Sequence, residues 1–174
     1  MGSVNRPESS AVPKPRLAVR RFILYDRCIG CTTCEEVCRF INDDLTFIKL
    51  YEIEPGLSKP LSCLHCIRAP CVAVCPTAAL AFDKSGAVIN RPARCIGCTL
   101  CISACPFGIP EPTTAGYIVK CDLCSKLRSR GLEPGCVATC PTNSIIWGNP
   151  EDIIKVTRRR ALTKLTESLK PLNS

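Results

Sequence analysis

The chain has 174 residues, a formal net charge of +8 and only 5% aromatic residues, and 16 of the residues counted as apolar are cysteines. So few large apolar side chains exclude a conventional core of the usual size. No apolar run approaches the roughly 18 residues that a membrane-spanning helix needs. Cysteine-bound centres or disulfides must therefore provide part of the stability.

The first 60 residues contain the first of four cysteine runs. Residues 1–16 are rich in proline and serine and predict a flexible tail, and residues 17–25 predict a strand. The cysteines of the first run are separated by two, two and three residues: Cys28, Cys31, Cys34 and Cys38. Residues 40–60 hold no cysteine and predict one strand, Thr46 to Ile53, ended by a Pro-Gly turn.

The N-terminal sequence does not read as a targeting signal. Its first residues lack the apolar stretch of a secretory signal, and Arg20 and Arg21 are followed by Cys28 before a cleavable apolar segment can form. We therefore expect a cytoplasmic protein with reduced thiols rather than a disulfide-bonded secreted protein.

Two cysteine runs in the middle of the chain carry the most specific pattern. The second run is Cys63, Cys66, Cys71 and Cys75, the third is Cys95, Cys98, Cys101 and Cys105, and a proline follows each. Three close cysteines, a fourth three residues later and a proline are typical of bacterial ferredoxins, where the fourth cysteine ligates the other iron–sulfur cluster of a pair. Between the runs, residues 78–82 and 87–90 predict a hairpin around a turn at residues 83–86.

A looser fourth run and a helix complete the chain. A proline-rich loop at residues 107–114 and a short predicted strand at 117–119 precede this run, which has a basic insert and a final proline. Its cysteines are Cys121, Cys124, Cys136 and Cys140. Residues 144–147 predict a strand that is the counterpart of the one before the first run. A cap residue, a proline and two acids then predict a helix from Asn149 to about Leu169.

Four runs can complete four clusters, because each run lends its fourth cysteine to a partner run. The adjacent second and third runs form the most ferredoxin-like unit, which leaves the first and fourth to pair across it. This nested arrangement also lets the first strand meet the last. The alternative pairs the first run with the second and the third with the fourth, and it splits that unit. Zinc would explain paired cysteines but not the recurrent spacing or the Cys-Pro endings.

Clusters explain the positive charge better than a nucleic-acid partner does. A cubane held by four thiolates carries about −2, so four of them contribute about −8 and balance the formal +8. We therefore expect no nucleic-acid partner. The polar C-terminal segment also leads us to expect no direct membrane insertion.

Together, the four runs resemble those of the four-cluster electron-transfer subunits of molybdenum and tungsten pterin oxidoreductases, such as dimethyl sulfoxide reductase and formate dehydrogenase. The resemblance covers most of the chain from Phe22 to Trp147. It implies an α+β fold of two nested bacterial-ferredoxin-like modules, with short hairpins and short helices around four [4Fe–4S] clusters. The expected modules are residues 17–60 with 107–149 and the inserted residues 61–106, and a C-terminal helix and tail occupy 150–174.

The resemblance also implies which cysteines hold each cluster. The four expected ligand sets are Cys28, Cys31, Cys34 and Cys140; Cys38, Cys121, Cys124 and Cys136; Cys63, Cys66, Cys71 and Cys105; and Cys75, Cys95, Cys98 and Cys101. Some relatives replace a cysteine of the third run and hold a three-iron centre. Cys101 is present here, so four cubanes are expected.

The sequence offers no nucleophile–base pair, phosphate loop or open metal position, so we expect a non-catalytic subunit that conducts electrons. The resemblance implies single-electron transfer between a pterin-containing catalytic subunit (tungsten or molybdenum; aldehyde or formate) and a flavin, NAD-reactive or hydrogenase partner. A tungsten aldehyde oxidoreductase with a flavin subunit suits the size of the chain. The alternative is a free soluble polyferredoxin that shuttles electrons between separate enzymes, and self-stacking of subunits is a further hypothesis.

Four features outside the cysteine runs have a structural and a functional interpretation. His65, the only histidine, is expected to pack beside a cluster rather than ligate it. Trp147 is expected to serve packing rather than electron relay. Lys120 either raises the potential of a cluster or is solvated at a strand end. Arg158 to Arg160 form a solvated helix face or a docking site for an acidic partner.

Overall fold

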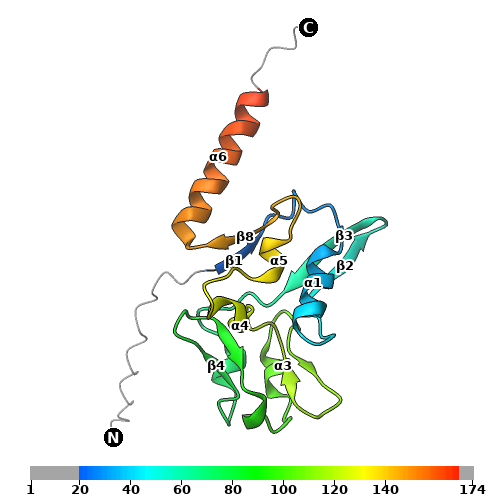
Figure 1. The fold of residues 1–174 in the computed structure, drawn as a ribbon, viewed down its shortest axis with the longest axis vertical. Coiled ribbons are helices and arrows are strands. Elements are labelled where there is room, and N and C mark those ends of the chain that lie inside the picture. The colour runs from blue at the N-terminus through cyan, green and yellow to red at the C-terminus, as the bar shows by residue number, and fades with distance from the viewer. Residues whose placement is uncertain (1–19, 169–174) are drawn as a thin grey trace, which may run out of the picture.

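The computed structural model describes residues 20–168 as a small mixed structure of short helices and two-stranded sheets (Figure 1). The elements in chain order are β1 (Arg20–Ile23), α1 (Thr33–Ile41), β2 (Ile48–Glu54), β3 (Leu57–Ser62), α2 (Pro70–Ala73), β4 (Leu80–Phe82), β5 (Val88–Asn90), the 3₁₀ helix η1 (Pro92–Arg94), α3 (Leu100–Ala104), β6 (Glu111–Pro112), β7 (Ile118–Val119), α4 (Ser125–Arg128), α5 (Gly135–Ala138), β8 (Ile145–Gly148) and α6 (Pro150–Ser168). The predicted tail at 1–16 lies outside the described residues.

The first and last strands pair, as the nested arrangement predicts. β1 and β8 are antiparallel, with Arg20 opposite Gly148 and Ile23 opposite Ile145. The ladder continues one residue further, because the Leu24 amide donates to the Ser144 carbonyl at 2.7 Å. This pairing joins residues more than 120 positions apart, so the middle of the chain forms a long connection between the two paired strands.

The hairpin predicted between the second and third runs is confirmed. β4 and β5 are antiparallel, with Leu80 opposite Asn90. The Asp83 side chain forms the turn, because its Oδ1 accepts from the amides of Ser85 and Ala87 at 2.8 and 3.0 Å. An aspartate that hydrogen-bonds the backbone two residues on is a common turn initiator, so this hairpin follows from local sequence.

Two strands, β3 and β6, lie where the sequence did not predict a strand, and both contain proline. The segment at 40–60 forms a β2–β3 hairpin rather than one strand, and Pro60 in β3 lies opposite Leu50. The predicted proline-rich loop contains β6, where Pro112 lies opposite Ile118. Proline is tolerated at sheet edges, and in a two-stranded sheet both strands are edges.

The apolar interior consists of two small clusters rather than one core, and cysteines take part in both. One comprises Cys34, Cys38, Ile48, Cys136 and Ile145. The other comprises Ala69, Cys71, Leu80, Val88, Cys101 and Ile118. Each is too small to stabilise a domain by apolar burial alone, which agrees with the exclusion drawn from composition.

The long helix α6 extends away from the rest of the molecule, at the end opposite β4 and α3 (Figure 1). It begins as predicted, with the Asn149 side chain accepting from the Asp152 amide at 3.0 Å. None of its described residues is buried, and Asp26 forms ion pairs with Arg160 and Lys164. Over residues 20–168, no helix combines the length and apolarity that crossing a membrane requires.

Candidate metal centres

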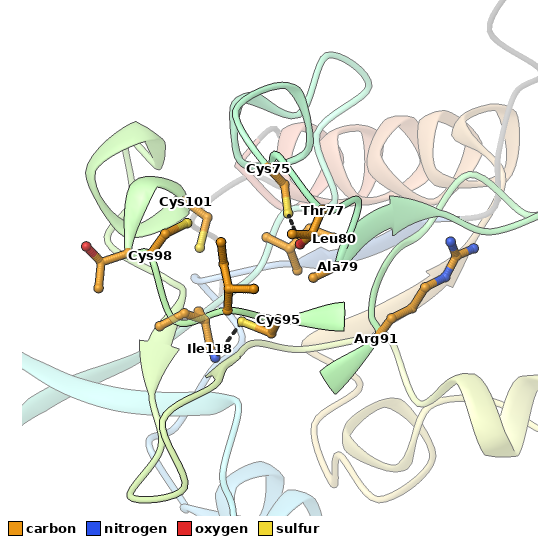
Figure 2. Close-up of a pocket in the computed structure, with 11 residues that line it drawn as sticks. Cys75, Thr77, Ala79, Leu80, Arg91, Cys95, Cys98, Cys101 and Ile118 are labelled. Atoms are coloured by element: carbon orange, nitrogen blue, oxygen red, sulfur yellow. Dashed lines mark hydrogen bonds between the residues drawn. The ribbon is translucent and has the colours of Figure 1, made fainter. Parts of the chain in front are cut away.

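Four cavities are each lined by four cysteines, and we number them I to IV. The space between their walls, part of it open to solvent, measures about 280 to 390 Å³. Cavity I is lined by Cys28, Cys31, Cys34 and Cys140. Cavity II is lined by Cys38, Cys121, Cys124 and Cys136. Cavity III is lined by Cys63, Cys66, Cys71 and Cys105. Cavity IV is lined by Cys75, Cys95, Cys98 and Cys101 (Figure 2). The cysteines that line each cavity are those of one ligand set expected from the resemblance.

Short helices place successive cysteines in neighbouring cavities. In α1, Cys34 lines cavity I and Cys38, one helical turn later, lines cavity II. Cys101 in α3 lines cavity IV, and Cys105 at the end of that helix lines cavity III. Because residues four apart on a helix lie one turn apart, one short helix supplies a cysteine to each of two neighbouring cavities. Cavity I therefore adjoins cavity II, and cavity III adjoins cavity IV.

Cavities II and III are the inner pair, and one arginine contacts both sets of cysteines. The Arg21 Nη1 lies 3.6 Å from Cys136 Sγ and 3.9 Å from Cys121 Sγ, both of cavity II. Its Nη2 donates to the carbonyl of Cys63, of cavity III, at 3.1 Å. The four cavities thus follow one another in a row from I to IV.

Two cysteine loops have the same local conformation at the two ends of the row. Gly30 and Gly97 occupy equivalent positions in the first and third runs, with φ of +71° and +68°, values that suit glycine. A β-carbon at Gly97 would lie 2.5 Å from the Gly116 carbonyl oxygen. The backbone therefore passes too closely here for any other residue.

Backbone amides point at cysteine sulfurs, as one contact in each of cavities II, III and IV illustrates. The Phe47 amide lies 3.2 Å from Cys38 Sγ, and the His65 amide lies 3.4 Å from Cys63 Sγ. The Ile118 amide lies 3.3 Å from Cys95 Sγ (Figure 2). Hydrogen bonds to a thiolate favour its charged form, which is the form that ligates a metal.

The end cavities also contain a repeated Cys-Pro-Thr segment that stabilises thiolate. Burial alone would raise the pKa of Cys140, but Ser144, the Ile145 amide and Thr142 lower it to about 7. At the equivalent position in cavity IV, the pKa of Cys75 is lowered by the Leu80 amide and by Thr77 (Figure 2), against the effect of burial. Such sulfurs are prepared as metal ligands before the metal arrives.

For other cysteines, the surroundings raise the pKa of the thiol instead of lowering it. Burial, followed by the proximity of Cys136, raises the pKa of Cys34 to about 12, and burial raises that of Cys124 to about 12 as well. Buried thiolates crowded together are unfavourable unless a cation compensates them. A metal centre supplies this positive charge, and the donor set therefore fits a cysteine-bound metal cluster.

The geometry fits a cluster of several metal atoms better than a single ion. In the part of the chain that the structure describes, no three His, Cys, Asp or Glu side chains converge closely enough to hold one ion. A zinc site needs its sulfurs within about 2.3 Å of a single centre. Sulfurs spread around a cavity wall suit a cubane, whose iron atoms each take one thiolate.

His65 lines none of the cysteine cavities, which disfavours it as a ligand. It is 3% exposed, and its Nδ1 accepts from the Val88 amide at 3.1 Å. Burial and the nearby cations of Lys120 and Arg21 hold its pKa well below the ordinary value. A neutral imidazole with an accepting Nδ1 carries its proton on Nε2, for which residues 20–168 provide no acceptor.

Lys120 is not solvated, contrary to one of its two interpretations. It is 1% exposed, and its ammonium group donates to the carbonyls of Val88 and Cys121 at 2.6 and 2.8 Å. Trp147 lies in β8 opposite Arg21 and is partly buried, as a packing residue would be. Arg158 and Arg159 are exposed on α6.

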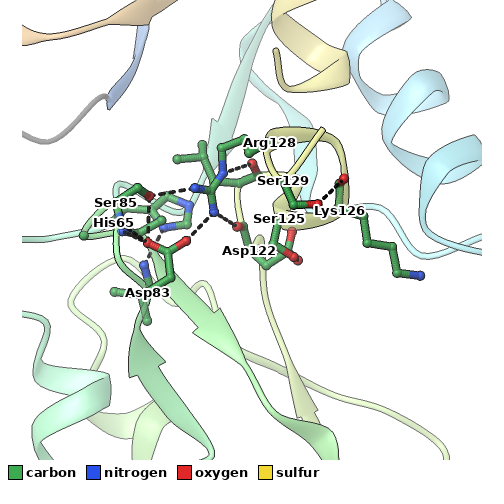
Figure 3. A network of polar contacts seen from close by, with 12 residues as sticks. His65, Asp83, Ser85, Asp122, Ser125, Lys126, Arg128 and Ser129 are labelled. Atoms are coloured by element: carbon green, nitrogen blue, oxygen red, sulfur yellow. Dashed lines mark hydrogen bonds and ion pairs between the residues drawn. The ribbon is translucent and has the colours of Figure 1, made fainter. Parts of the chain in front are cut away.

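A network of basic side chains around the Asp83 turn and His65 is not evident from the sequence. Arg128 of α4 forms an ion pair with Asp83 at 2.6 Å and donates to Ser85 at 2.6 Å (Figure 3). Arg20 donates to the carbonyls of His65 and Gly86 at 2.7 and 3.1 Å. The only sequence signal is the presence of arginines in a predicted strand and in the basic insert of the fourth run.

Comparison with known proteins identifies the family. Residues 56–150 match the model of the 4Fe-4S dicluster domain. The chain is 36% identical over 147 residues to the thiosulfate reductase electron transfer subunit PhsB of Salmonella typhi, which covers 75% of this chain and 76% of that protein. It is 38% identical over 125 residues to the polyferredoxin-like subunit of an aliphatic sulfonate oxidoreductase of Pyrococcus furiosus, covering 68% and 69%.

A third relative extends the same pattern. The B subunit of the anaerobic dimethyl sulfoxide reductase of Escherichia coli is 33% identical over 153 residues, which covers 77% of this chain and 75% of that protein. The dicluster match includes the second, third and fourth cysteine runs, and the relatives cover two thirds or more of the chain. The chain therefore belongs to the 4Fe-4S dicluster family of iron–sulfur proteins that its cysteine spacing predicts.

Proposed function

We propose that this chain is an electron-transfer subunit that carries four [4Fe–4S] clusters, one in each of cavities I to IV. The observation that carries the proposal is the row of four cavities, each lined by four cysteines drawn from two runs. A bound cluster of this type takes up and releases one electron. The relatives support the proposal, because one is named as an electron transfer subunit and the others as parts of oxidoreductases.

The chain contributes ligands, spacing and exclusion of solvent rather than catalytic groups. Helices α1 and α3 each place cysteines in two neighbouring cavities, so clusters bound there would be neighbours in the row. In the two-module description, residues 17–60 with 107–149 supply the cysteines of cavities I and II, and residues 61–106 supply those of cavities III and IV. Backbone amides, among them those of Phe47, His65 and Ile118, and the hydroxyls of Thr77 and Ser144 hydrogen-bond the sulfurs, which helps to set the potentials.

The two ends of the row are the proposed sites of electron entry and exit. Cys31 of cavity I and Cys98 of cavity IV are exposed, whereas no cysteine of the inner cavities is. Ile29 and Ile96 stand beside them with 69% and 66% of their surface exposed. Exposed apolar side chains next to a redox centre suit docking of a partner. One end would face a catalytic subunit and the other an electron donor or acceptor.

The partner we propose is a tungsten or molybdenum pterin enzyme acting on an aldehyde or formate. A flavin, NAD-reactive or hydrogenase subunit would occupy the other end, and the complex would reside in the cytoplasm. The support is the family, whose members serve oxidoreductases that are named for thiosulfate, dimethyl sulfoxide and aliphatic sulfonate. Helix α6, with no buried residue, further suits a chain that works within a complex rather than as a free polyferredoxin.

The test is anaerobic purification of the chain from its native host through an affinity tag. We expect a larger pterin-containing subunit and a second redox subunit to co-purify, and substrate of the pterin enzyme to reduce the clusters. A cluster-loaded chain that remains a monomer, and that becomes reduced only by exchange with separate enzymes, would contradict the subunit assignment. It would favour the free shuttle instead. Sizing at several concentrations tests self-stacking in the same preparation.

A further inference from the structure

The boundary between cavities II and III contains two positively charged side chains, Arg21 and Lys120. Arg21 contacts the sulfurs of Cys136 and Cys121 on one side and the carbonyl of Cys63 on the other. Lys120 lines cavity III, and its ammonium group donates to the carbonyl of Cys121, a cysteine of cavity II. Both cations therefore bridge the two inner cavities.

Neither cation is neutralised by a carboxylate within residues 20–168. The ion pairs in this part of the chain involve other bases, such as Arg128 with Asp83 and Lys49 with Glu111. Lys120 is 1% exposed and has carbonyl partners at 2.6 and 2.8 Å, so water does not solvate its charge either. A buried charge without a counter-ion is costly. The counter-charge that fits this position is the negative charge of the neighbouring clusters.

Each cubane with four thiolates carries about −2 when oxidised and about −3 when reduced. A cation in a low-dielectric site stabilises the more negative state of a neighbouring group more than the less negative state. It also reduces the repulsion between two adjacent clusters. By contrast, Arg91, which lines cavity IV, is exposed, so solvent screens its effect.

Resting on the function proposed above, we propose that Arg21 and Lys120 raise the reduction potentials of the clusters in cavities II and III. Both residues act through their positive charge. The raised potentials make the clusters in cavities II and III the favoured positions for the transferred electron. Arg21 acts mainly on cavity II, where it meets two sulfurs, and Lys120 mainly on cavity III, whose wall it forms.

The test is an anaerobic redox titration of the cluster-loaded chain, followed by low-temperature electron spin resonance. We expect Arg21→Gln to lower the equilibrium constant for reduction of one cluster about tenfold or more, a fall of about 59 mV or more in its midpoint potential. Lys120→Gln should do the same to a different cluster. Arg159→Gln, which removes an equal charge from exposed α6, should leave all midpoints unchanged.

Charge-conserving variants separate electrostatics from structure. Arg21→Lys and Lys120→Arg change the hydrogen bonds but keep the charge, so their midpoints should stay within about threefold of wild type in equilibrium constant. If Arg21→Gln fails to assemble clusters, the midpoint potentials of Lys120→Gln, Arg21→Lys and Lys120→Arg test the inference instead. Full iron loading with unchanged midpoints in both glutamine variants would overturn the inference, as would tenfold shifts in the charge-conserving ones. Wild-type protein without clusters would instead overturn the proposed function.

Discussion

A substitution at Gly97 tests the placement of the third cysteine run, and the equivalent substitution at Gly30 is its matched control. Both glycines have φ near +70° in a Cys-Ile-Gly-Cys loop, so alanine pays the same left-handed cost of about 1–2 kcal/mol at each. The surroundings differ. A β-carbon at Gly30 would meet the Ser58 carbonyl oxygen at 3.4 Å, an ordinary contact, whereas at Gly97 it would meet the Gly116 oxygen at 2.5 Å.

The difference between the two contacts sets the expected magnitude. Overpacking against backbone costs about 1–3 kcal/mol, so Gly97→Ala should destabilise the protein by about 2–5 kcal/mol in all, and Gly30→Ala by only about 1–2 kcal/mol. With a urea m-value of about 2 kcal/mol/M, the midpoint of Gly97→Ala should lie about 0.5–1.5 M below that of Gly30→Ala.

The assay is anaerobic urea unfolding of the two cluster-loaded variants followed by circular dichroism, together with iron analysis. Gly97→Ala should also lose iron from cavity IV before the other sites, because the strained loop carries Cys95 and Cys98. Equal midpoints for the two variants, or a lower midpoint for Gly30→Ala, would refute the close approach of the Gly97 and Gly116 backbones.

Three further predictions concern the ion pairs and the ends of the row. Removing the Arg128–Asp83 pair should show a coupling free energy of about 1 kcal/mol in a double-mutant cycle of unfolding. Against the effect of burial, Ser85 and Arg128 hold the pKa of Asp83 below its ordinary value. The contribution is therefore present above about pH 4 and is lost as the pH falls through the folded-state pKa, so an unchanged acid midpoint in Asp83→Asn would contradict it. Ile29→Glu and Ile96→Glu should each leave the iron content unchanged but slow electron exchange with one partner only, measured by stopped flow; slowing with both partners would argue against two separate ends. Asp26→Asn should leave the unfolding midpoint nearly unchanged, because the Asp26 carboxylate that pairs with Arg160 and Lys164 in the second half of α6 is exposed, but should speed amide exchange in that helix. Unaltered exchange would show that the pair does not hold the helix.

The presence of iron–sulfur runs is a local signal that spacing makes visible, but the spacing left two pairings of the runs open, and the four cysteine sets came from the resemblance. Each of the four cavities is lined by one of the sets that the resemblance implies. The β4–β5 hairpin and the start of α6 were also predictable, because Asp83 and Asn149 act on amides a few residues away. Local chemistry of this kind is visible in sequence.

The remaining features depend on contacts between distant residues. Pro60 and Pro112 argued against strands, and only the two-stranded pairing makes them tolerable. Arg21 reaches Cys136 across 115 positions, and Lys120 donates to Val88 across 32. Lys120 precedes Cys121, but this adjacency left its two interpretations open, and the local sequence gives Arg21 no such signal. Such bridging positions become visible only when the two halves of the chain are placed together.

The most direct measurement of the central claim is the iron and acid-labile sulfide content of anaerobically purified protein. Four cubanes on 16 cysteines predict about 16 iron and 16 sulfide atoms per chain, with four separate one-electron reduction steps. Substantially fewer irons in carefully handled material, or metal without labile sulfide, would contradict the account.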